Sequence, residues 1–177
     1  MPLPSGASLP PIFINALQPV EMPPGRDSWV IQVVTRGGFA GRGKGDLIIT
    51  SQGNVLCNPS NESCPKAIPK DALESLTQIV VSAKTDDINE SSLSSCRDCY
   101  ATLLALYKRG RDGMEQKYIV YWDDATLAEV SKDIRQVYES VVRIAGGRNK
   151  YSCVPYRRTR HNNGMHPTPL HGAFHES

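Results

Sequence analysis

Residues 29–35 read WVIQVVT, a run in which bulky apolar and β-branched side chains occupy most positions. Aromatic and β-branched residues favour strands, and a strand with one face in water would alternate apolar with polar residues. This run is apolar on both sides. It therefore predicts a strand in the centre of a sheet.

Two hairpins are predicted after this strand. Residues 46–50 and 55–57 (DLIIT and VLC) are apolar runs joined by a turn around Gly53. Residues 99–109 and 115–124 lie on either side of the turn GRDG, and the second arm alternates clearly between two sets of side chains. Both pairs are expected to be antiparallel, as hairpins require.

Two amphipathic helices complete the pattern. Pro69 suits the first turn of a helix, and apolar residues then recur at three-to-four spacing over 73–83. Thr126 and Glu129 match a capping box, which predicts that the second helix begins there. Its apolar stripe runs over 127–144 and indicates packing against a sheet.

The predicted order is strand, hairpin, helix, hairpin, helix. Because the strands come as adjacent hairpins, the sequence predicts an α+β fold, an antiparallel sheet of about four to five strands packed by two helices. Residues 1–27 contain seven of the thirteen prolines and no helical or strand period, which predicts a disordered leader. We expect a single α+β domain over 28–147 and a disordered basic tail over 148–177.

The composition excludes some classes of function. The 177 residues carry a net charge of +2 and an apolar fraction of 40%, which fits a globular protein with a core. So small a charge does not by itself indicate nucleic-acid binding. No apolar stretch is long enough to cross a bilayer, so no membrane association is expected. The chain starts with neither a charged n-region nor a continuous apolar h-region, and without a signal peptide the cytoplasm is the default location.

The cysteines allow three interpretations. Cys57 and Cys64 flank NPSNES, and Cys96 and Cys99 form a C-x-x-C motif, so the two pairs could be disulfides of an oxidising compartment. The same four thiolates could instead bind zinc. Six residues separate the first pair, however, and no histidine lies between the pairs. Without a signal peptide, reduced cysteines are favoured.

Residues 35–46 (TRGGFAGRGKGD) hold five glycines directly after the predicted central strand. Gly38, Gly43 and Lys44 match the G-x-x-x-x-G-K part of a phosphate-binding loop. That motif needs Ser or Thr next, where this chain has Gly45, and it must open onto a helix, whereas a strand pattern follows here. Nucleotide binding is therefore disfavoured.

The basic residues of the loop allow a second interpretation, contact with nucleic acid. Its Arg and Lys side chains would bind phosphates and Phe39 would stack on a base, although the second aromatic of an RNA-recognition motif is missing. The run RRTRH in the tail would add electrostatic attraction. Acidic residues are nearly as numerous as basic ones, and aromatic and basic residues are not interleaved elsewhere, so this interpretation stays the alternative.

A third interpretation accounts better for the glycines. Five flexible residues cost conformational entropy on folding unless the backbone must approach something closely. Phe39 lies among them as the one large apolar side chain. The composition is typical of an insertion loop, which offers backbone groups to a protein partner and one hydrophobic anchor to its pocket.

The strand that runs into GGFAG (37–41) resembles the signature of the emfourin family, small bacterial inhibitors of thermolysin-type metalloproteases. The rest of the layout is similar too, with a proline-initiated helix at Pro69, an Asp-x-aromatic start to a hairpin at 98–100, and an acidic turn at 123–124 before the last helix. The resemblance covers about residues 29–145.

The resemblance implies a non-enzymatic protein that inhibits a thermolysin-type metallopeptidase through the loop 36–45. Phe39 would enter an apolar specificity pocket while the flanking backbone pairs with the protease cleft. No cofactor and no metal is implied. The expected partner-binding residues are Arg36, Gly37, Gly38, Phe39, Ala40, Gly41 and Arg42.

Catalytic residue types are scarce in the predicted domain. All four histidines, at positions 161, 166, 171 and 175, lie in the tail, where NNGMHPTP is similar to translated read-through of the recombination site that ends bacterial integron gene cassettes. This leaves no histidine for Ser-His, Cys-His or His-metal chemistry. The acidic pairs 86–87 and 123–124 lie in connectors, where carboxylates usually cap helices or solvate turns, so we expect no enzyme.

Overall fold

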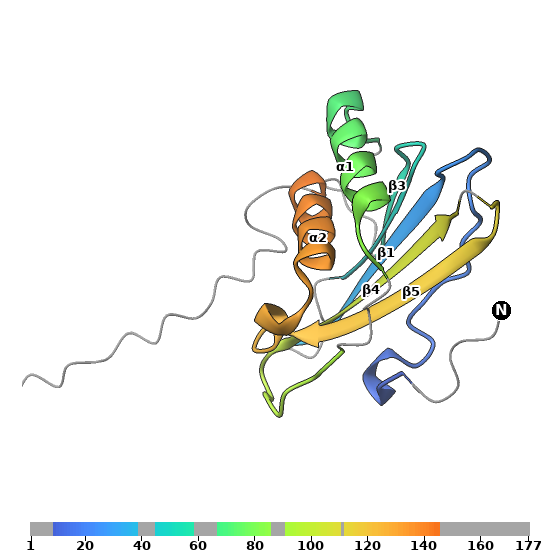
Figure 1. Cartoon of the computed structure of the whole chain (residues 1–177). Helices are drawn as coiled ribbons and strands as arrows, with labels where there is room; N and C mark the ends of the chain where they lie inside the picture. Colours follow the sequence, from blue (N-terminus) through green and yellow to red (C-terminus); the bar gives the residue numbers. More distant parts are fainter. Residues whose placement is uncertain (1–8, 39–44, 59–66, 86–90, 111, 146–177) are drawn as a thin grey trace, which may run out of the picture.

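The computed structural model describes residues 9–38, 45–58, 67–85, 91–110 and 112–145. They contain a five-stranded antiparallel sheet with the strand order β3-β2-β1-β4-β5. Two helices pack on one face of this sheet, as Figure 1 shows. The predicted α+β fold is confirmed.

The helices and strands follow the predicted order. Along the chain they are η1 (Pro11–Phe13), β1 (Trp29–Gly37), β2 (Gly45–Thr50), β3 (Val55–Asn58), α1 (Lys70–Ser82), β4 (Tyr100–Arg109), β5 (Glu115–Asp123), η2 (Leu127–Glu129) and α2 (Lys132–Ile144). The two short 3₁₀ helices, η1 and η2, are not predicted from the sequence.

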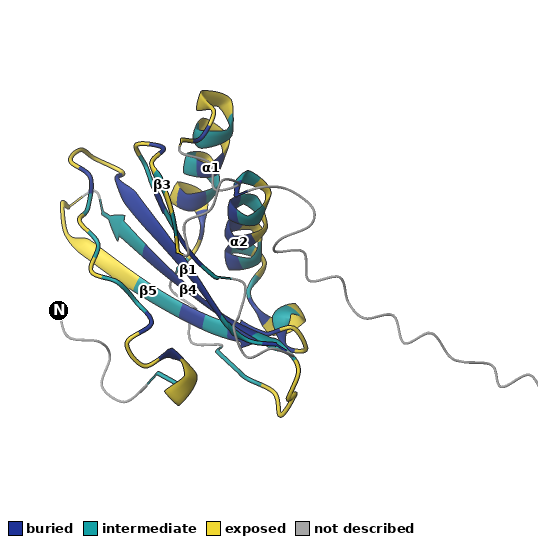
Figure 2. Ribbon diagram, turned by 180° about the vertical axis from the view of Figure 1, so that it is seen from behind, coloured by how far each residue is buried: buried dark blue, intermediate teal, exposed yellow. Residues whose placement is uncertain are grey.

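Strand β1 is the central strand of the sheet, with β2 on one side and β4 on the other. Its first seven residues, 29–35, are all buried. Figure 2 shows the contrast between β1, which is buried over residues 29–35, and β5, which lies at the edge and begins exposed. The prediction of a central strand that is apolar on both sides is confirmed.

The sheet face under the helices holds the main hydrophobic core. Alternate side chains of β1 point to this face, and both helices bury their apolar stripes against it. The buried residues that meet there include Trp29, Ile31, Val33, Leu76, Val80, Ile134, Val137 and Val141. The Tyr138 ring meets Trp122 edge-on with 5.0 Å between the ring centroids, which favours one arrangement of α2 on the sheet.

The opposite face of the sheet is covered by the first part of the described leader, residues 9–17, for which the sequence predicts disorder. Phe13 in η1 is fully buried and packs with Val34 and Leu103 of the sheet. Its ring centroid lies 6.3 Å from that of Tyr121. The prediction of a disordered leader is therefore wrong here, because Phe13 docks the first part of the leader on the sheet without any periodic pattern.

The second half of the leader is held by one arginine. Nη1 of Arg109 donates to the carbonyl oxygens of Pro23 and Gly25, each at 3.4 Å. The backbone N–H of Arg109 donates to the Ser28 carbonyl at 2.9 Å. The leader is thus fixed at Phe13 and again where it joins β1.

The last helix begins later than its capping box predicts. Residues Leu127–Glu129 form η2, and α2 begins at Lys132 with Ser131 as its N-cap. The Thr126 hydroxyl is engaged in the turn after β5, where it accepts the N–H of Asp123 at 3.0 Å. A local hydrogen bond of this kind competes with the helix for the same side chain, so the cap moves to the next serine.

Several predicted segments lie outside the described residues. They are the first part of the leader (1–8), the middle of the glycine-rich loop (39–44) and the predicted tail (148–177). In the part of the chain that is described, no helix combines the length and apolar character needed to cross a membrane.

Replacing Phe13 tests the docking of the leader. Phe13→Ala removes a fully buried ring and should lower the free energy of unfolding by about 3–5 kcal/mol. Ile14→Ala is the matched control, because Ile14 is 61% exposed and its replacement should be nearly silent. Urea unfolding of both variants measures the difference, and equal stability of the two would show that the leader does not hold the sheet.

Candidate functional site

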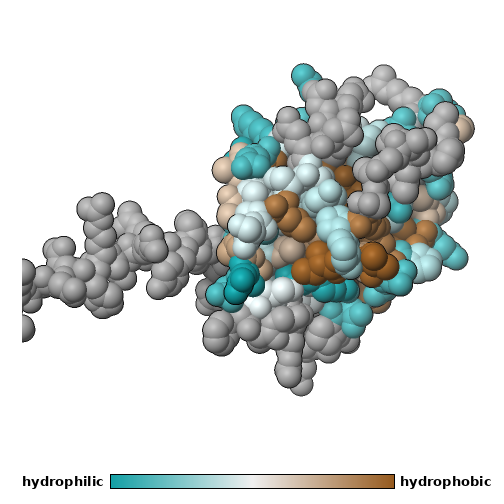
Figure 3. Space-filling view, turned by 90° about the horizontal axis from the view of Figure 1, so that it is seen from below, coloured by the Kyte–Doolittle hydropathy of each residue, from teal (hydrophilic) through white to brown (hydrophobic). Residues whose placement is uncertain are grey.

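Three connections of the chain meet at one end of the sheet. The glycine-rich loop leaves β1 at Gly37 and re-enters β2 at Gly45. Gly37 is paired with Tyr100 at the start of β4, and Ala101 with Asp123 at the end of β5. Figure 3 looks onto this side of the molecule and shows hydrophobic side chains exposed among polar ones. This loop end, with residues 36–38, 45–46, 91–100 and 123–126, is the candidate site.

The predicted partner-binding residues fall into two groups. Arg36, Gly37 and Gly38 are described and lie at the loop end. Phe39, Ala40, Gly41 and Arg42 lie outside the described residues. The geometry of the site is therefore that of the base of the loop.

An ion pair closes this base. The guanidinium of Arg36 donates to both carboxylate oxygens of Asp46, with 3.1 Å between Nη2 and Oδ2. The Asp46 side chain is only 9% exposed, so the pair is weakly screened by salt. The Thr35 hydroxyl donates to the Gly45 carbonyl at 2.8 Å and adds a second link between the strands. Bidentate pairs are strongly directional, so the two ends of the loop are held in one orientation.

The ion pair gives Arg36 a structural role that the sequence does not predict. Val34 pairs with Asp46, and Arg36 lies two residues further along β1 on the same face. The strand register therefore brings the two charges together, and only a predicted register could have revealed the pair. Because Asp46 compensates its charge, Arg36 is a poor ligand for a nucleic-acid phosphate.

Two glycines bring the loop base against the residues before β4. Gly37 and Gly38 have φ values of 80° and 78°, which residues with a side chain rarely adopt. The Gly38 N–H donates to the Cys99 carbonyl at 3.1 Å. A Cβ atom on Gly38 would lie 2.4 Å from the Tyr100 ring, so this ring rests directly on the glycine backbone. Both glycines are thus required by packing as well as by backbone conformation.

A buried carboxylate joins the other two connections. Oδ2 of Asp123 accepts the backbone N–H and the hydroxyl of Ser94, and Oδ1 accepts the N–H groups of Ala125 and Thr126. Burial alone would raise the pKa of Asp123, but these hydrogen bonds outweigh it and the pKa is lowered. The sequence predicts a turn for this acidic pair but not its link to Ser94.

The neighbouring Asp124 completes the link to β4. Its carboxylate accepts the Tyr100 N–H at 3.2 Å, and its own N–H donates to the Tyr100 carbonyl at 3.2 Å. Tyr100 therefore contacts the glycine-rich loop with its ring and the end of β5 with its backbone. Both carboxylates of the acidic pair serve as hydrogen-bond acceptors that hold the loop end together.

The cysteines of the C-x-x-C motif form a disulfide, with 5.5 Å between the Cα atoms of Cys96 and Cys99. Cys57 is also disulfide-bonded, and Cys64 lies outside the described residues. Sulfurs bonded in this way cannot bind zinc as thiolates. No cluster of three or more potential metal ligands occurs among the described residues. The expectation of reduced cysteines and the zinc alternative are therefore both wrong for Cys96 and Cys99.

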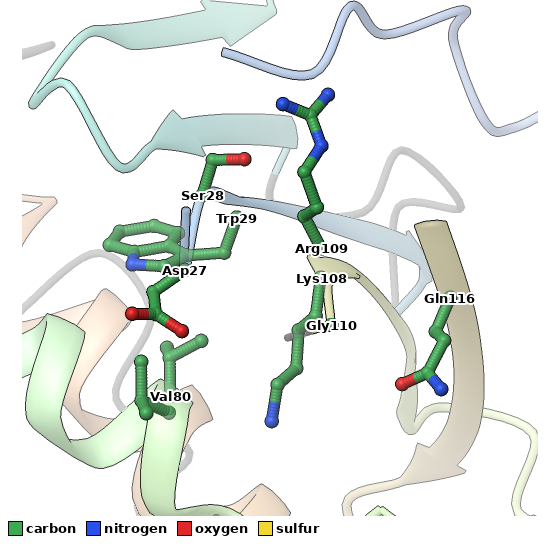
Figure 4. Close-up of a pocket in the computed structure, with 9 residues that line it drawn as sticks. Asp27, Ser28, Trp29, Val80, Lys108, Arg109, Gly110 and Gln116 are labelled. Atoms are coloured by element: carbon green, nitrogen blue, oxygen red, sulfur yellow. The ribbon is translucent and has the colours of Figure 1, made fainter. Parts of the chain in front are cut away.

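A second candidate, a cavity of about 210 Å³, lies at the opposite end of the sheet. Figure 4 shows the cavity beside Trp29 at the start of β1. Val80 of α1 lies below Trp29, and the Lys108 side chain projects between Val80 and Gln116. The Lys108 ammonium donates to the Ala83 carbonyl at 3.3 Å, directly after α1, where a cation is favoured. Arg109 pairs with Glu115 at 2.9 Å. The two cations beside the cavity thus have structural partners, and the loop end is the better candidate.

Comparison with known proteins identifies no relative, since no protein-family model, curated protein or solved structure matches the chain. The resemblance to the emfourin family rests on the sequence motifs and stays a prediction.

The contact between Gly38 and Tyr100 can be tested by alanine substitution. Gly113 has the same φ of 78° but open space around it, so Gly113→Ala should cost only the backbone strain of about 1 kcal/mol. Gly38→Ala should cost about 1–3 kcal/mol more, because the Tyr100 ring must move away. In a Tyr100→Ala background this excess should vanish. The free energies of unfolding are measured in urea. If Gly38→Ala is still the more destabilising change in the Tyr100→Ala background, a contact other than Tyr100 excludes a side chain at position 38.

The lowered pKa of Asp123 predicts a dependence of stability on pH. Its ionised form stabilises the native state above the pKa of an unfolded aspartate, about 4, and this contribution is lost as the pH falls through the lower native pKa. Asp123→Asn should therefore be less stable than wild type at neutral pH, and the difference should shrink in acid. The exposed Glu139→Gln controls for loss of one charge. The free energy of unfolding of both proteins is measured in urea at a series of pH values. A difference between wild type and Asp123→Asn that does not change with pH would contradict the role of the carboxylate.

Proposed function

We propose that the protein is a non-enzymatic inhibitor of a thermolysin-type metallopeptidase and binds it through the glycine-rich loop over 36–45. The observation that carries the proposal is the fixed base of this loop. The Arg36–Asp46 ion pair holds its two ends together, and the hydrogen bond from Gly38 to Cys99 holds one end against β4. A loop whose ends are fixed before binding loses less conformational entropy on association.

The composition of the loop supports insertion into a cleft. Phe39 would fill an apolar specificity pocket, and a single well-buried aromatic residue can dominate the energy of an interface. The glycines on either side carry no side chains that would clash with the cleft walls, so backbone N–H and C=O groups can pair with the peptidase. The GGFAG motif that resembles emfourins lies at this position.

The surface beside the loop base also suits a protein partner. Ile12 of the leader is 43% exposed, and its Cδ1 lies 4.0 Å from the position of a Cβ on Gly37. Protein interfaces combine an apolar centre with a polar rim, and Ile12 would extend the apolar area around Phe39. The leader would then contribute to binding as well as to folding.

The nucleic-acid alternative finds less support at the loop end. Arg36 is neutralised by Asp46, the exposed Arg97 lies next to Asp98, and two further acidic residues, Asp123 and Asp124, lie in the adjoining connection. Their negative charge would repel a phosphate backbone, on which nucleic-acid binding depends. Salt distinguishes the two functions, because phosphate binding weakens steeply with ionic strength whereas insertion of an aromatic side chain hardly responds.

Substitution of Phe39 tests the proposal. Inhibition of peptide hydrolysis is measured for thermolysin and close bacterial relatives with the intact protein and with Phe39→Ala. The variant should lose about 2–4 kcal/mol of binding free energy, the range of an aromatic hot spot, while its unfolding free energy stays unchanged. Inhibition by the intact protein should also persist at high salt.

Three outcomes would contradict the proposal. A Phe39→Ala variant with collapsed stability would show that Phe39 belongs to the core. Inhibition that weakens steeply as the salt concentration rises would contradict insertion of Phe39. It would favour the electrostatic binding on which the nucleic-acid alternative depends. Complete absence of inhibition by the intact protein would remove the functional part of the resemblance.

A further inference from the structure

The C-x-x-C disulfide lies directly against the base of the glycine-rich loop. Cys96 is exposed, as are the two residues enclosed by the bridge, Arg97 and Asp98, while Cys99 is half-buried. Exposed disulfides are the ones that thiol reagents reach and that tend to be labile. We propose that Cys96–Cys99 is a redox modification site and that its state, set by exchange with a dithiol, controls the position of the loop base.

The link between the bridge and the loop passes through one residue. The sulfur of Cys99 belongs to the bridge, and the carbonyl of the same residue accepts the Gly38 N–H at 3.1 Å. A Cβ on Gly37 would lie 3.0 Å from this carbonyl oxygen, so the loop backbone passes close to it. Any displacement of Cys99 therefore moves the hydrogen-bond acceptor of the loop base.

The bridge is a covalent constraint on the segment before β4. Residues 94–99 belong to no described helix or strand. Ser94 is fixed by Asp123 and Tyr100 by Asp124, and the Cys96 N–H donates to the Ser94 hydroxyl at 3.1 Å. Opening the bridge leaves the Ser94 contacts in place but frees residues 97–99. It also loosens the peptide group between Cys99 and Tyr100, which carries both the Cys99 carbonyl and the Tyr100 N–H. The expected change is local, and the sheet stays intact.

The chemistry is thiol–disulfide exchange with a dithiol as the reductant. A thiolate of the dithiol attacks the exposed Cys96 sulfur, the S–S bond breaks, and the Cys99 sulfur leaves as a thiolate that takes up a proton. The second thiol of the reductant, as its thiolate, then attacks the mixed disulfide and releases Cys96. The two cysteines gain two electrons and two protons, and the dithiol becomes a disulfide.

The first experiment does not depend on any protease. The full chain is equilibrated in dithiothreitol redox buffers of graded ratio, the thiols of Cys96 and Cys99 are quantified by alkylation and mass spectrometry, and Gly38 amide exchange is followed by NMR. Reduction should accelerate Gly38 exchange by at least about tenfold while the β1 amides of 29–35 stay protected. The variant Cys96→Ser/Cys99→Ser should show the fast exchange without reductant and no further response, which separates this bridge from the disulfide of Cys57.

Two results of this experiment would overturn the inference. Gly38 exchange that is the same in the oxidised, reduced and substituted forms would mean that the bridge does not hold the loop base. Loss of β1 protection when only this bridge is opened, in the Cys96→Ser/Cys99→Ser variant or on reduction of a Cys57→Ser variant, would make the bridge a general stabiliser of the fold instead of a local control. A Cys57→Ser variant, which lacks the other disulfide and keeps the Cys96–Cys99 bridge, is measured under both conditions as well, so failure of the double variant to fold would not prevent a decision.

A second readout concerns the proposed function, on which the regulatory consequence rests. Inhibition of thermolysin is measured with the oxidised and reduced chain, and the reduced form should inhibit about tenfold more weakly because its loop base is no longer fixed. A response of Gly38 without inhibition in either form would refute the inhibitor function and leave the redox site standing. Equal inhibition by the oxidised and reduced forms, with no change in Gly38 amide exchange, would refute the redox site and leave the inhibitor function standing.

Discussion

Strand β1 presents apolar side chains to both faces of the sheet, so neither face can be left to water. Trp29, Ile31 and Val33 require the helices on one side, and Val30 and Val34 require a cover on the other. Burial of apolar surface is the dominant driving force of folding. Here the second face is covered by the proline-rich leader, which has little regular structure beyond η1. The glycine-rich loop follows the end of this most buried strand, and the base of the loop is held by the pairing of β1 with β2 and β4.

The loop end is stabilised mainly by hydrogen bonds between connections. Asp46, Asp123 and Asp124 each accept bonds from another segment, and two of them, Asp46 and Asp123, are buried. Desolvating a carboxylate is costly, and the cost is offset only where donors surround it, so these residues specify one arrangement of the three connections. Such fixed carboxylates give the loop end a defined shape, which is what the proposed binding function requires.

The sheet and both helices could be predicted because their side chains repeat with the periods of strand and helix. The docking of the leader could not, since Phe13 contributes a single contact and its partners are known only once β1 and β4 are paired. The pair of Arg36 and Asp46 likewise depends on strand register. The start of α2 does not follow from the sequence, because Thr126 and Ser131 are both good caps and only the turn after β5 selects Ser131. Of the predicted binding residues, the structure describes Arg36, Gly37 and Gly38 at the loop base, and the role of Phe39 follows from the composition of the loop and from the resemblance.

The two strands that carry the glycine-rich loop are also hydrogen-bonded neighbours, paired over six residues from Val30–Thr50 to Thr35–Gly45. A single peptide-bond cleavage within the loop would therefore leave both fragments embedded in the same sheet, each with its own share of the core. The two strand ends at the base would still be joined by the Arg36–Asp46 ion pair and by the hydrogen bonds between β1 and β2. For a protease that cut there, the two products would still share one sheet and would not separate without unfolding it.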